Sequence, residues 1–291
     1  MRPSSVAAPP HPEANGPLRR SHPALARLRR LSRRREARRS EGVVLVDGPV
    51  LLAEAVGAGV EVLEVFCEAD VDVPVDVQCP VRSVAPGELV RVLDLVTPQG
   101  LVTVVRQPTA GIEEVLDCAT AVVRPFVVGV EIQDPGNLGT LIRLSEAAGA
   151  AGIVLTGGTA DVWGPKAVRA AAGSSFRLPV ALDVEISSLL DVCAARGIPM
   201  IATVPRAGSP PDQLDLSGVA AFCIGNEARG LPAPVVDQSA MLITIPMEGR
   251  VESLNAAVAG SIVMFEAARQ RRQLGGGGSQ IGDSTNRDGA P

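Results

Sequence analysis

The segment PFVVGVEI, residues 125–132, constrains the fold more than any other part of the chain, because nearly every position in it is apolar. A strand without a polar face must be covered on both sides, as happens in a parallel sheet flanked by helices. After this segment, short apolar stretches with strand character alternate with helical stretches. The pattern predicts an α/β domain with a mostly parallel, doubly covered sheet over residues 122–273.

Within that domain the expected strands follow short apolar runs and the expected helices follow a 3.6-residue period. The strands are expected at 152–157, near 178–181, and at 199–204, 219–225 and 241–246; the helices at 138–149, 164–173, 186–196 and 254–272.

The chain before this domain reads as a second, smaller α/β unit over residues 22–108. A helix is expected from Pro23, where leucines repeat on one face and arginines fill the other. Strands are expected at 42–48, 60–69 and 101–108, and helices at 49–59 and 86–96. Residues 109–121 are expected to be a linker with a short helical turn, 1–21 a disordered basic arm, and 274–291 a flexible glycine-rich tail.

Charge is distributed unevenly along the chain. Residues 1–40 contain 11 Arg against only Glu13 and Glu36, whereas the whole chain has a net charge of −5. A basic end on an acidic body favours a polyanionic partner such as RNA. The alternative is a solvated, Arg-rich helix without a partner. Aromatic residues are only 2 % of the chain, so stacking of RNA bases on aromatic side chains cannot be a main binding mode.

Several classes of protein are disfavoured by what the sequence lacks. The five cysteines are scattered without metal-ligand or redox spacing, which is typical of reduced thiols in a cytoplasmic protein. No apolar run is long enough to span a membrane. His11 and His22 both lie near the N-terminus, and there is no GxGxxG, P-loop or HExxH motif. We therefore expect no metal, no membrane association and no histidine-based catalysis.

Two glycine-punctuated loops follow the last two expected strands, IGNEARGLP at 224–232 and IPMEGRVESLNAAVAG at 245–260. Open parallel sheets bind ligands at the carboxyl ends of their strands. Gly225 and Gly230 would let a ligand approach the backbone, and such a pocket suits a flat, uncharged group such as an adenine nucleoside. Left-handed turns after a strand explain the two glycines almost as well.

Polar residues beside these loops are candidates for chemistry. Asn137 is expected to cap the helix that carries Arg143, with small neighbours that leave the guanidinium open to a phosphate or ribose. In the last helix, Ser253 is expected at the N-cap and Asn255 in the first turn, where its amide could bind a ribose hydroxyl. The alternatives are an Arg143–Glu146 surface pair and a purely capping role for Asn137.

The last expected helix carries a second pattern. Apolar residues repeat along it at Leu254, Val258, Ile262 and Phe265. Such a stripe is typical of a core or of a dimer interface.

Three segments, taken together and in order, resemble the motifs of the SpoU (TrmH-type) RNA ribose 2′-O-methyltransferases of the SPOUT superfamily. They are VEIQDPGNLGTLIRLSEAAGAAGIVLTGGTADVWGPKAVRAAAGS, IGNEARGLP and IPMEGRVESLNAAVAGSIVMFEAARQR. The front unit resembles the small ribosomal-protein-like RNA-binding domain that precedes the catalytic domain in many members. Here Asp47-Gly48 stands where those members commonly have Glu-Gly.

The resemblance implies a trefoil-knotted α/β domain that binds S-adenosylmethionine, and a homodimer with its active site at the subunit interface. Matching the motifs implies that Gly225, Ile245 and Leu254 contact the cofactor through backbone groups. Arg143 would be the central catalytic residue.

The other site residues implied by the motifs are Asn137, Ser253 and Asn255, which would orient ribose and phosphate, and Glu227, a candidate polar partner in the same pocket. The expected reaction is methyl transfer to a ribose 2′-OH of ribosomal RNA. Transfer RNA is the alternative substrate, and a non-catalytic RNA-binding protein of the same fold is the alternative function. Self-protection against a ribosome-binding antibiotic is a variant that the sequence does not separate from housekeeping modification.

Overall fold

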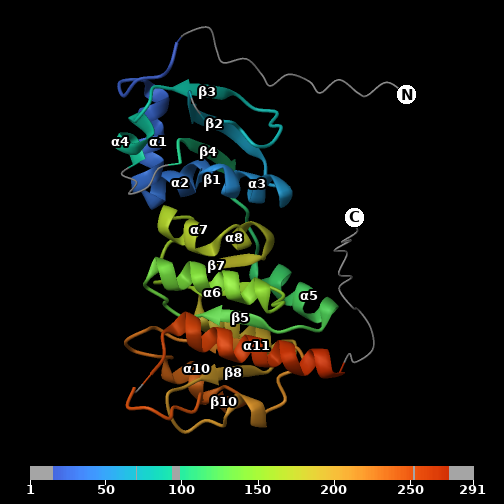
Figure 1. The fold of residues 1–291 in the computed structure, drawn as a ribbon. Coiled ribbons are helices and arrows are strands. Elements are labelled where there is room, and N and C mark those ends of the chain that lie inside the picture. The colour runs from blue at the N-terminus through green and yellow to red at the C-terminus, as the bar shows by residue number, and fades with distance from the viewer. Residues whose placement is uncertain (1–15, 70, 94–98, 252, 275–291) are drawn as a thin grey trace, which may run out of the picture.

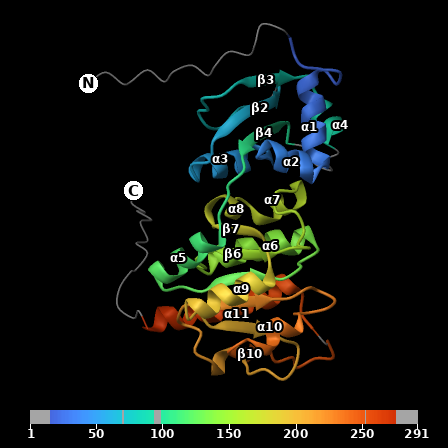
Figure 2. The same cartoon turned by 180° about the vertical axis from the view of Figure 1, so that it is seen from behind.

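The computed structural model describes residues 16–69, 71–93, 99–251 and 253–274. Two α/β domains are stacked end to end (Figures 1 and 2). The strands are β1 (Val43–Asp47), β2 (Val62–Glu68), β3 (Val81–Val84), β4 (Leu101–Arg106), β5 (Phe126–Gly129), β6 (Ile153–Thr156), β7 (Val180–Val184), β8 (Met200–Thr203), β9 (Ala221–Ile224) and β10 (Met241–Ile243). The helices are α1 (Pro23–Arg33), α2 (Arg35–Glu41), α3 (Pro49–Gly57), α4 (Glu88–Leu93), α5 (Ile112–Val122), α6 (Pro135–Ala147), α7 (Pro165–Ala171), α8 (Ser174–Arg177), α9 (Ile186–Ala195), α10 (Ala233–Asp237) and α11 (Ala256–Leu274), with a 3₁₀ turn at Pro211–Gln213.

The large domain is built on a six-stranded sheet in the order β10-β8-β9-β5-β6-β7, in which every pair is parallel. All four residues of β5 are buried. Alternate side chains of the sheet belong to different cores: Val127 packs with α6, α7 and α11, whereas Phe126 and Val128 pack with α5 and α9. The sheet is therefore covered on both faces, which confirms the α/β class predicted from the apolar strand.

The small domain contains a four-stranded sheet in the order β1-β4-β2-β3, with β4 antiparallel to both neighbours and β3 parallel to β2. The Arg-rich α1 is part of its core, because Leu25, Leu28 and Leu31 are fully buried there. Several of its arginines are engaged within the fold; Arg27, for example, pairs with Glu41 and with Glu64. The basic segment is thus a structural element as well as a charged surface.

The structure contains elements that the sequence did not predict, among them β3, α8 and α10, and it differs from the predicted domain boundaries in two places. The expected linker at 109–121 contains α5, an 11-residue helix whose Val115 and Leu116 are buried against the large sheet. The expected disordered arm includes Leu18, whose amide bonds to Ser83 O at 2.8 Å and whose carbonyl accepts from Ala85 N at 3.0 Å. The remainder of that arm (1–15) and the tail after 274 lie outside the described residues, as does the end of the helix expected at 86–96.

All five cysteines are free thiols, and Cys193 and Cys223 are buried. Across the described ranges, no helix combines the length and the apolar character needed to cross a bilayer.

The close approach of α6 and α7 fixes the face of the large domain beside the candidate site. Gly139 of α6 lies against α7, where an added Cβ would come within 2.4 Å of the Ala167 carbonyl oxygen. The sequence suggests that this glycine keeps the surroundings of Arg143 open, whereas in the structure it serves the contact between the two helices.

We predict that Gly139→Ala destabilises the fold by about 1–3 kcal/mol, because the new methyl group meets backbone atoms that cannot yield without moving α7. Thermal or denaturant unfolding measures this. Gly57→Ala at the end of α3 is the matched control: an added Cβ meets nothing within 4 Å there, so the variant should be as stable as the wild type or slightly more so. Equal stability of the two variants would contradict the packing argument.

Candidate active site

A pocket of about 460 Å³ lies at the carboxyl edge of the large sheet. It is formed where the chain leaves β8, β9 and β10, so three loops distant in sequence meet around one cavity. Its volume falls within the range of small-molecule sites. Its lining includes Thr203, Arg206, Ile224, Gly225, Glu227, Gly230, Val236, Ile243, Ile245, Ser253 and Leu254.

The loop after β9 is closed by its own backbone and by one buried side chain. The amides and carbonyls of Asn226 and Gly230 exchange two hydrogen bonds, of 3.1 and 2.9 Å. The Asn226 side chain donates to Glu131 O at 2.8 Å and accepts from the amides of Ala228 and Arg229 at 2.9 and 3.0 Å. Asn226 therefore fixes the shape of the loop after β9, which forms one wall of the pocket.

The two glycines of this loop act differently from one another. A Cβ on Gly225 would lie 2.4 Å from the Gly230 carbonyl carbon, so this position must be glycine for the loop to close on itself. Gly230 has φ +68°, a left-handed conformation that glycine adopts without strain. Both line the pocket, but their first role is to shape it.

A chain of hydrogen bonds joins three predicted site residues from three segments. Asn137 donates from Nδ2 to Glu227 Oε1 at 3.0 Å, and its Oδ1 accepts from Asn255 Nδ2 at 2.7 Å. The amides of Gln133 and Asp134 also donate to Glu227, at 3.2 and 3.3 Å. The structure thus brings Glu227, Asn137 and Asn255 together beside the pocket.

Two opposing effects act on the Glu227 carboxyl. Partial burial raises its pKa, but the hydrogen bonds from Asn137 and from the amides of Gln133 and Asp134 outweigh burial and hold the pKa below its ordinary value. Glu227 is consequently ionised at neutral pH and acts only as an acceptor, which fixes the Asn137 amide with its nitrogen towards the carboxylate.

The predicted helix caps were wrong by a few residues. α6 begins at Pro135, and its N-cap is Asp134, whose carboxylate accepts from Asn137 N at 2.9 Å. α11 begins at Ala256, and the side chain of Asn255 accepts from Ala257 N at 2.9 Å, so Asn255 caps it in place of Ser253. The corrections free the Asn137 side chain for the network and leave Ser253 lining the pocket.

Arg143 lies apart from the pocket of its own chain. It is exposed on α6, six residues or about 9 Å along the axis from Asn137, and it does not line the cavity. The helix α11 lies beside α6 (Figure 1) and packs on it through small residues such as Gly260. Val258, Ile262 and Phe265 of α11 are exposed. Arg143 and three of the four residues in the predicted stripe therefore belong to the solvent-exposed surface of two adjacent helices.

Sequence reasoning missed part of the site. The end of β8 and the loop after it, with Thr203 and Arg206, line the pocket but were not predicted as part of the site. Its position at the carboxyl end of an expected parallel strand was the signal that could have identified it. Within the described ranges, no group of three or more His, Cys, Asp or Glu side chains is placed to hold a metal ion.

Fold and site together define an α/β protein with a nucleoside-sized pocket at the carboxyl edge of a parallel sheet. The model of the SpoU rRNA Methylase family matches residues 124–265. The 23S rRNA (guanosine(2553)-2′-O)-methyltransferase RlmP of Bacillus subtilis is 32 % identical over 233 residues, which is 79 % of this chain and 90 % of that protein. The chain belongs to the SpoU rRNA methylase family.

Solved structures agree with this assignment. The SpoU methyltransferase AviRb from Streptomyces viridochromogenes, in complex with the cofactor AdoMet, has a TM-score of 0.77 at 27 % identity, over 86 % of this chain and 98 % of that one. An AdoMet-bound rRNA methyltransferase from Sinorhizobium meliloti has a TM-score of 0.77 at 28 % identity, over 86 % and 95 % of the two chains. The likeness covers both domains and not only the methylase domain.

We predict that Glu227→Gln lowers thermal stability at neutral pH, because the carboxylate accepts three hydrogen bonds that a carboxamide cannot all accept. The pKa of Glu227 is lower in the folded chain than its ordinary value of 4.5, so its contribution is full above that value and is lost as the pH falls through the folded pKa. The melting temperatures of wild type and variant should therefore differ at pH 7 and converge as the pH falls below 4.5.

Glu114→Gln, which removes an exposed carboxylate of α5, controls for the loss of one negative charge. If the melting temperatures of the wild type and Glu227→Gln differ by the same amount from neutral to acidic pH, the ionised network is contradicted.

Proposed function

We propose that this protein is an S-adenosylmethionine-dependent methyltransferase that modifies a ribose 2′-OH of ribosomal RNA. The observation that carries the proposal is the meeting of the three loops in one pocket, with the Glu227–Asn137–Asn255 network at its side. The activities named for the relatives support rRNA as the substrate. Since rRNA is the proposed substrate, the proposed compartment is the cytoplasm.

The residues present fit the cofactor. Backbone and apolar side chains, among them Gly225, Ile245 and Leu254, suit an adenine nucleoside, and the ionised Glu227 favours a positive charge nearby. Arg206 offers a cation for a carboxylate. When bound, S-adenosylmethionine supplies a methyl group that is already activated by its sulfonium charge.

The chain's own residues position and stabilise the acceptor. Asn137, Asn255 and Ser253 orient the ribose hydroxyl and the adjoining phosphate, with Glu227 holding Asn137 in place. Arg143 is permanently charged and therefore serves as a cation beside the adjoining phosphate or the 2′ oxygen, not as a base. The hydroxyl proton passes to solvent water as the 2′ oxygen takes up the methyl group. Orientation supplies much of the rate, because the donor is activated before it meets the acceptor.

Arg143 can serve this role in a homodimer. Arg143 is exposed outside the pocket of its own chain, and α11, which packs against α6, carries exposed apolar residues; both support an interface where Arg143 of one copy lies at the pocket of the other. We further infer a trefoil knot: Ile245, Met247, Ser253 and Leu254 share one cavity with the loops after β8 and β9 before α11 packs onto α6. The small domain would serve as the ribosomal-protein-like RNA-binding unit.

The function is tested by incubating the full chain with methyl-labelled S-adenosylmethionine and either 23S rRNA or total tRNA, followed by mapping of ribose methylation. We expect 2′-O-methylation of rRNA. If only tRNA is modified, the substrate is tRNA and not rRNA. RNA binding without any methylated product, together with calorimetry that shows no binding of the donor, would favour a non-catalytic RNA-binding protein.

In the same assay, we predict that Arg143→Ala lowers the rate of methyl transfer by about 100-fold or more, the usual effect of removing one electrostatic stabiliser. Donor affinity, measured by calorimetry, should change little. Arg143→Lys retains the charge and should recover part of the rate. Full activity of Arg143→Ala would remove this residue from the mechanism.

We predict that Phe265→Glu converts a dimer into monomers, because it places a charge in the apolar patch on α11. Sedimentation or light scattering measures the mass. Val50→Glu is the matched control, since Val50 is also an exposed apolar residue but lies on α3 of the small domain. A wild-type monomer, or a dimer unaffected by Phe265→Glu, would contradict the proposed interface.

A further inference from the structure

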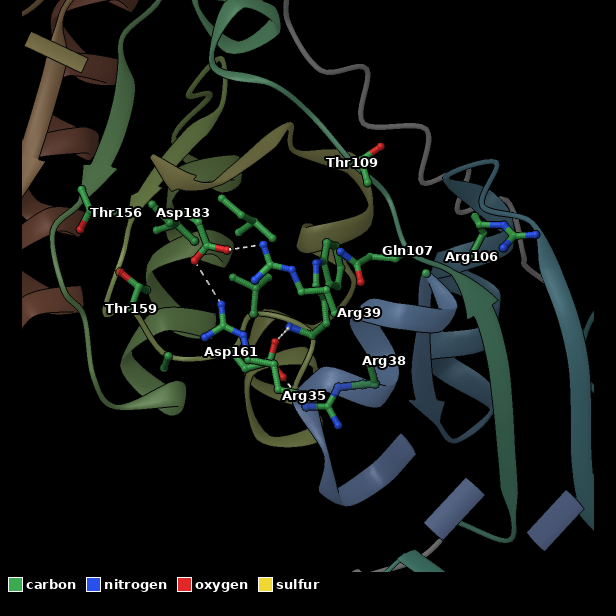
Figure 3. A pocket seen from close by; sticks show the side chains of 16 residues that line it. Arg35, Arg38, Arg39, Arg106, Gln107, Thr109, Thr156, Thr159, Asp161 and Asp183 are labelled. Carbon is green, nitrogen blue, oxygen red and sulfur yellow. Dashed lines mark hydrogen bonds and ion pairs between the residues drawn. The ribbon is translucent and has the colours of Figure 1, made fainter. Parts of the chain in front are cut away.

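A second cavity, of about 520 Å³, lies between the two domains (Figure 3). The small domain contributes Arg35, Arg38, Arg39 and Arg106, and the large domain contributes Asp161 and Asp183 among other residues. Three of these guanidinium groups, those of Arg35, Arg38 and Arg39, pair with the two carboxylates, whereas Arg106 pairs with Glu61 of its own domain. Glu36 lies beside Arg35 and Arg39 at the outer margin. None of these residues belongs to the pocket described above.

The arginines of this cavity are of two kinds. Arg38 is buried and fixed: it bonds to the carbonyls of Leu31 and Ser32 at the end of α1 and pairs with Asp161 of the large domain. Arg35 and Arg39 are more exposed and share one carboxylate, with Asp183 oxygens at 3.3 and 3.0 Å. Both cations share one exposed carboxylate, with Glu36 at the same margin, so an anion that binds both guanidinium groups competes directly with Asp183.

The backbone conformation of Asp183 orients its carboxylate towards Arg35 and Arg39. Asp183 has φ +54°, a left-handed conformation uncommon for a residue with a side chain, and it lies near the register shift between β6 and β7. This backbone turn presents the carboxylate to both guanidinium groups.

Polar atoms in the cavity wall lack partners. Arg38 Nε, Thr159 Oγ1 and Trp163 Nε1 are buried without a hydrogen-bond partner in the described chain, and all three residues line this cavity. Unpaired buried polar groups are rare in folded proteins and mark places where a polar ligand or a change of conformation satisfies them. Because each of these three atoms is itself almost inaccessible, they become available to a polar occupant only when the cavity wall rearranges.

The inter-domain cavity opens on the same edge of the sheet as the first pocket. It lies at the carboxyl ends of β6 and β7, whereas the first pocket lies at those of β8, β9 and β10. The order β10-β8-β9-β5-β6-β7 places β5, whose loop leads to Asn137, between them. A chain of nucleotides seated at the first pocket can therefore continue along one edge to the arginines.

We propose that the inter-domain cavity is a second RNA subsite, in which Arg35 and Arg39 exchange Asp183 for the phosphodiester oxygens of a nucleotide flanking the methylated one. The inference rests on the proposed function for the identity of the ligand. Guanidinium groups bind phosphate oxygens in the same paired geometry as carboxylate oxygens, so Asp183 occupies the positions that a phosphate takes. Arg38 and Asp161 hold the two walls together and do not take part in the exchange.

The test measures binding of full-length protein to 23S rRNA over a range of salt concentrations. We expect Arg35→Ala/Arg39→Ala to weaken binding about tenfold or more and to lower the slope of log affinity against log salt by about 0.7 to 1 for each phosphate that is no longer bound. Asp183→Asn should act in the opposite direction, because it releases both cations to the RNA. Affinity for S-adenosylmethionine should stay unchanged in both variants.

Two controls keep the result interpretable. Arg196→Ala removes an arginine that pairs with Glu113 and Asp117 shortly before β8 begins, and it should leave RNA affinity and slope unchanged. Arg39→Ala alone removes a side chain that is 68 % exposed, so it should fold even if the double variant does not, and it should show the same change at smaller size.

The proposal is overturned if wild type binds no RNA, or if folded Arg39→Ala and the double variant bind RNA with wild-type affinity and salt slope. Binding of inorganic phosphate that these variants abolish without any effect on RNA would identify a free-anion site, and would equally overturn it. Failure of the proposed function is separate: RNA bound with the expected salt slopes but never methylated would leave this subsite standing.

Discussion

The parallel direction of all six strands in the large sheet is the constraint on which the remaining structure depends. Parallel strands send every outgoing loop to the same edge, so segments far apart in the chain meet there without a dedicated binding domain. The hydrogen bonds by which Asn255 donates to Asn137 and Asn137 donates to Glu227 are possible only because their segments share this edge. The buried amide of Asn226 then stabilises the loop after β9 against its neighbour after β5.

The sequence predicted the fold class well because a strand that is buried on both faces has apolar residues at nearly every position. An unbroken apolar strand such as 125–132 is typical of a parallel sheet that helices cover on both sides. Helix caps left a weaker trace: Asp134, Asn137, Ser253 and Asn255 are all good capping residues, and only their hydrogen bonds distinguish the cap from the free amide. The helix at 112–122 was missed because a composition typical of a linker does not reveal that Val115 and Leu116 meet a sheet.

The sequence predicted which segments form the site, but not how their residues are arranged in space. Motif matching indicated Glu227, Asn137 and Asn255 together, but no sequence pattern states that Gly225 is needed for loop closure or that Gly139 lets two helices approach because it has no side chain. Arg143 is the instructive case, since the sequence expected it beside the ribose and the structure leaves it on an outer face of α6. Which chain supplies a residue to a site is a property of the assembly, and one sequence carries no direct record of it.

The helix α1 presents arginines outward while its leucines complete the interior of the small domain. Positive charge and architecture therefore occupy the same eleven residues, and deleting the helix removes both. Truncating this end to abolish nucleic-acid affinity would also expose the apolar side chains beneath it. Charge-reversing substitutions on the outer face, with the leucines retained, are the means by which the two roles can be separated.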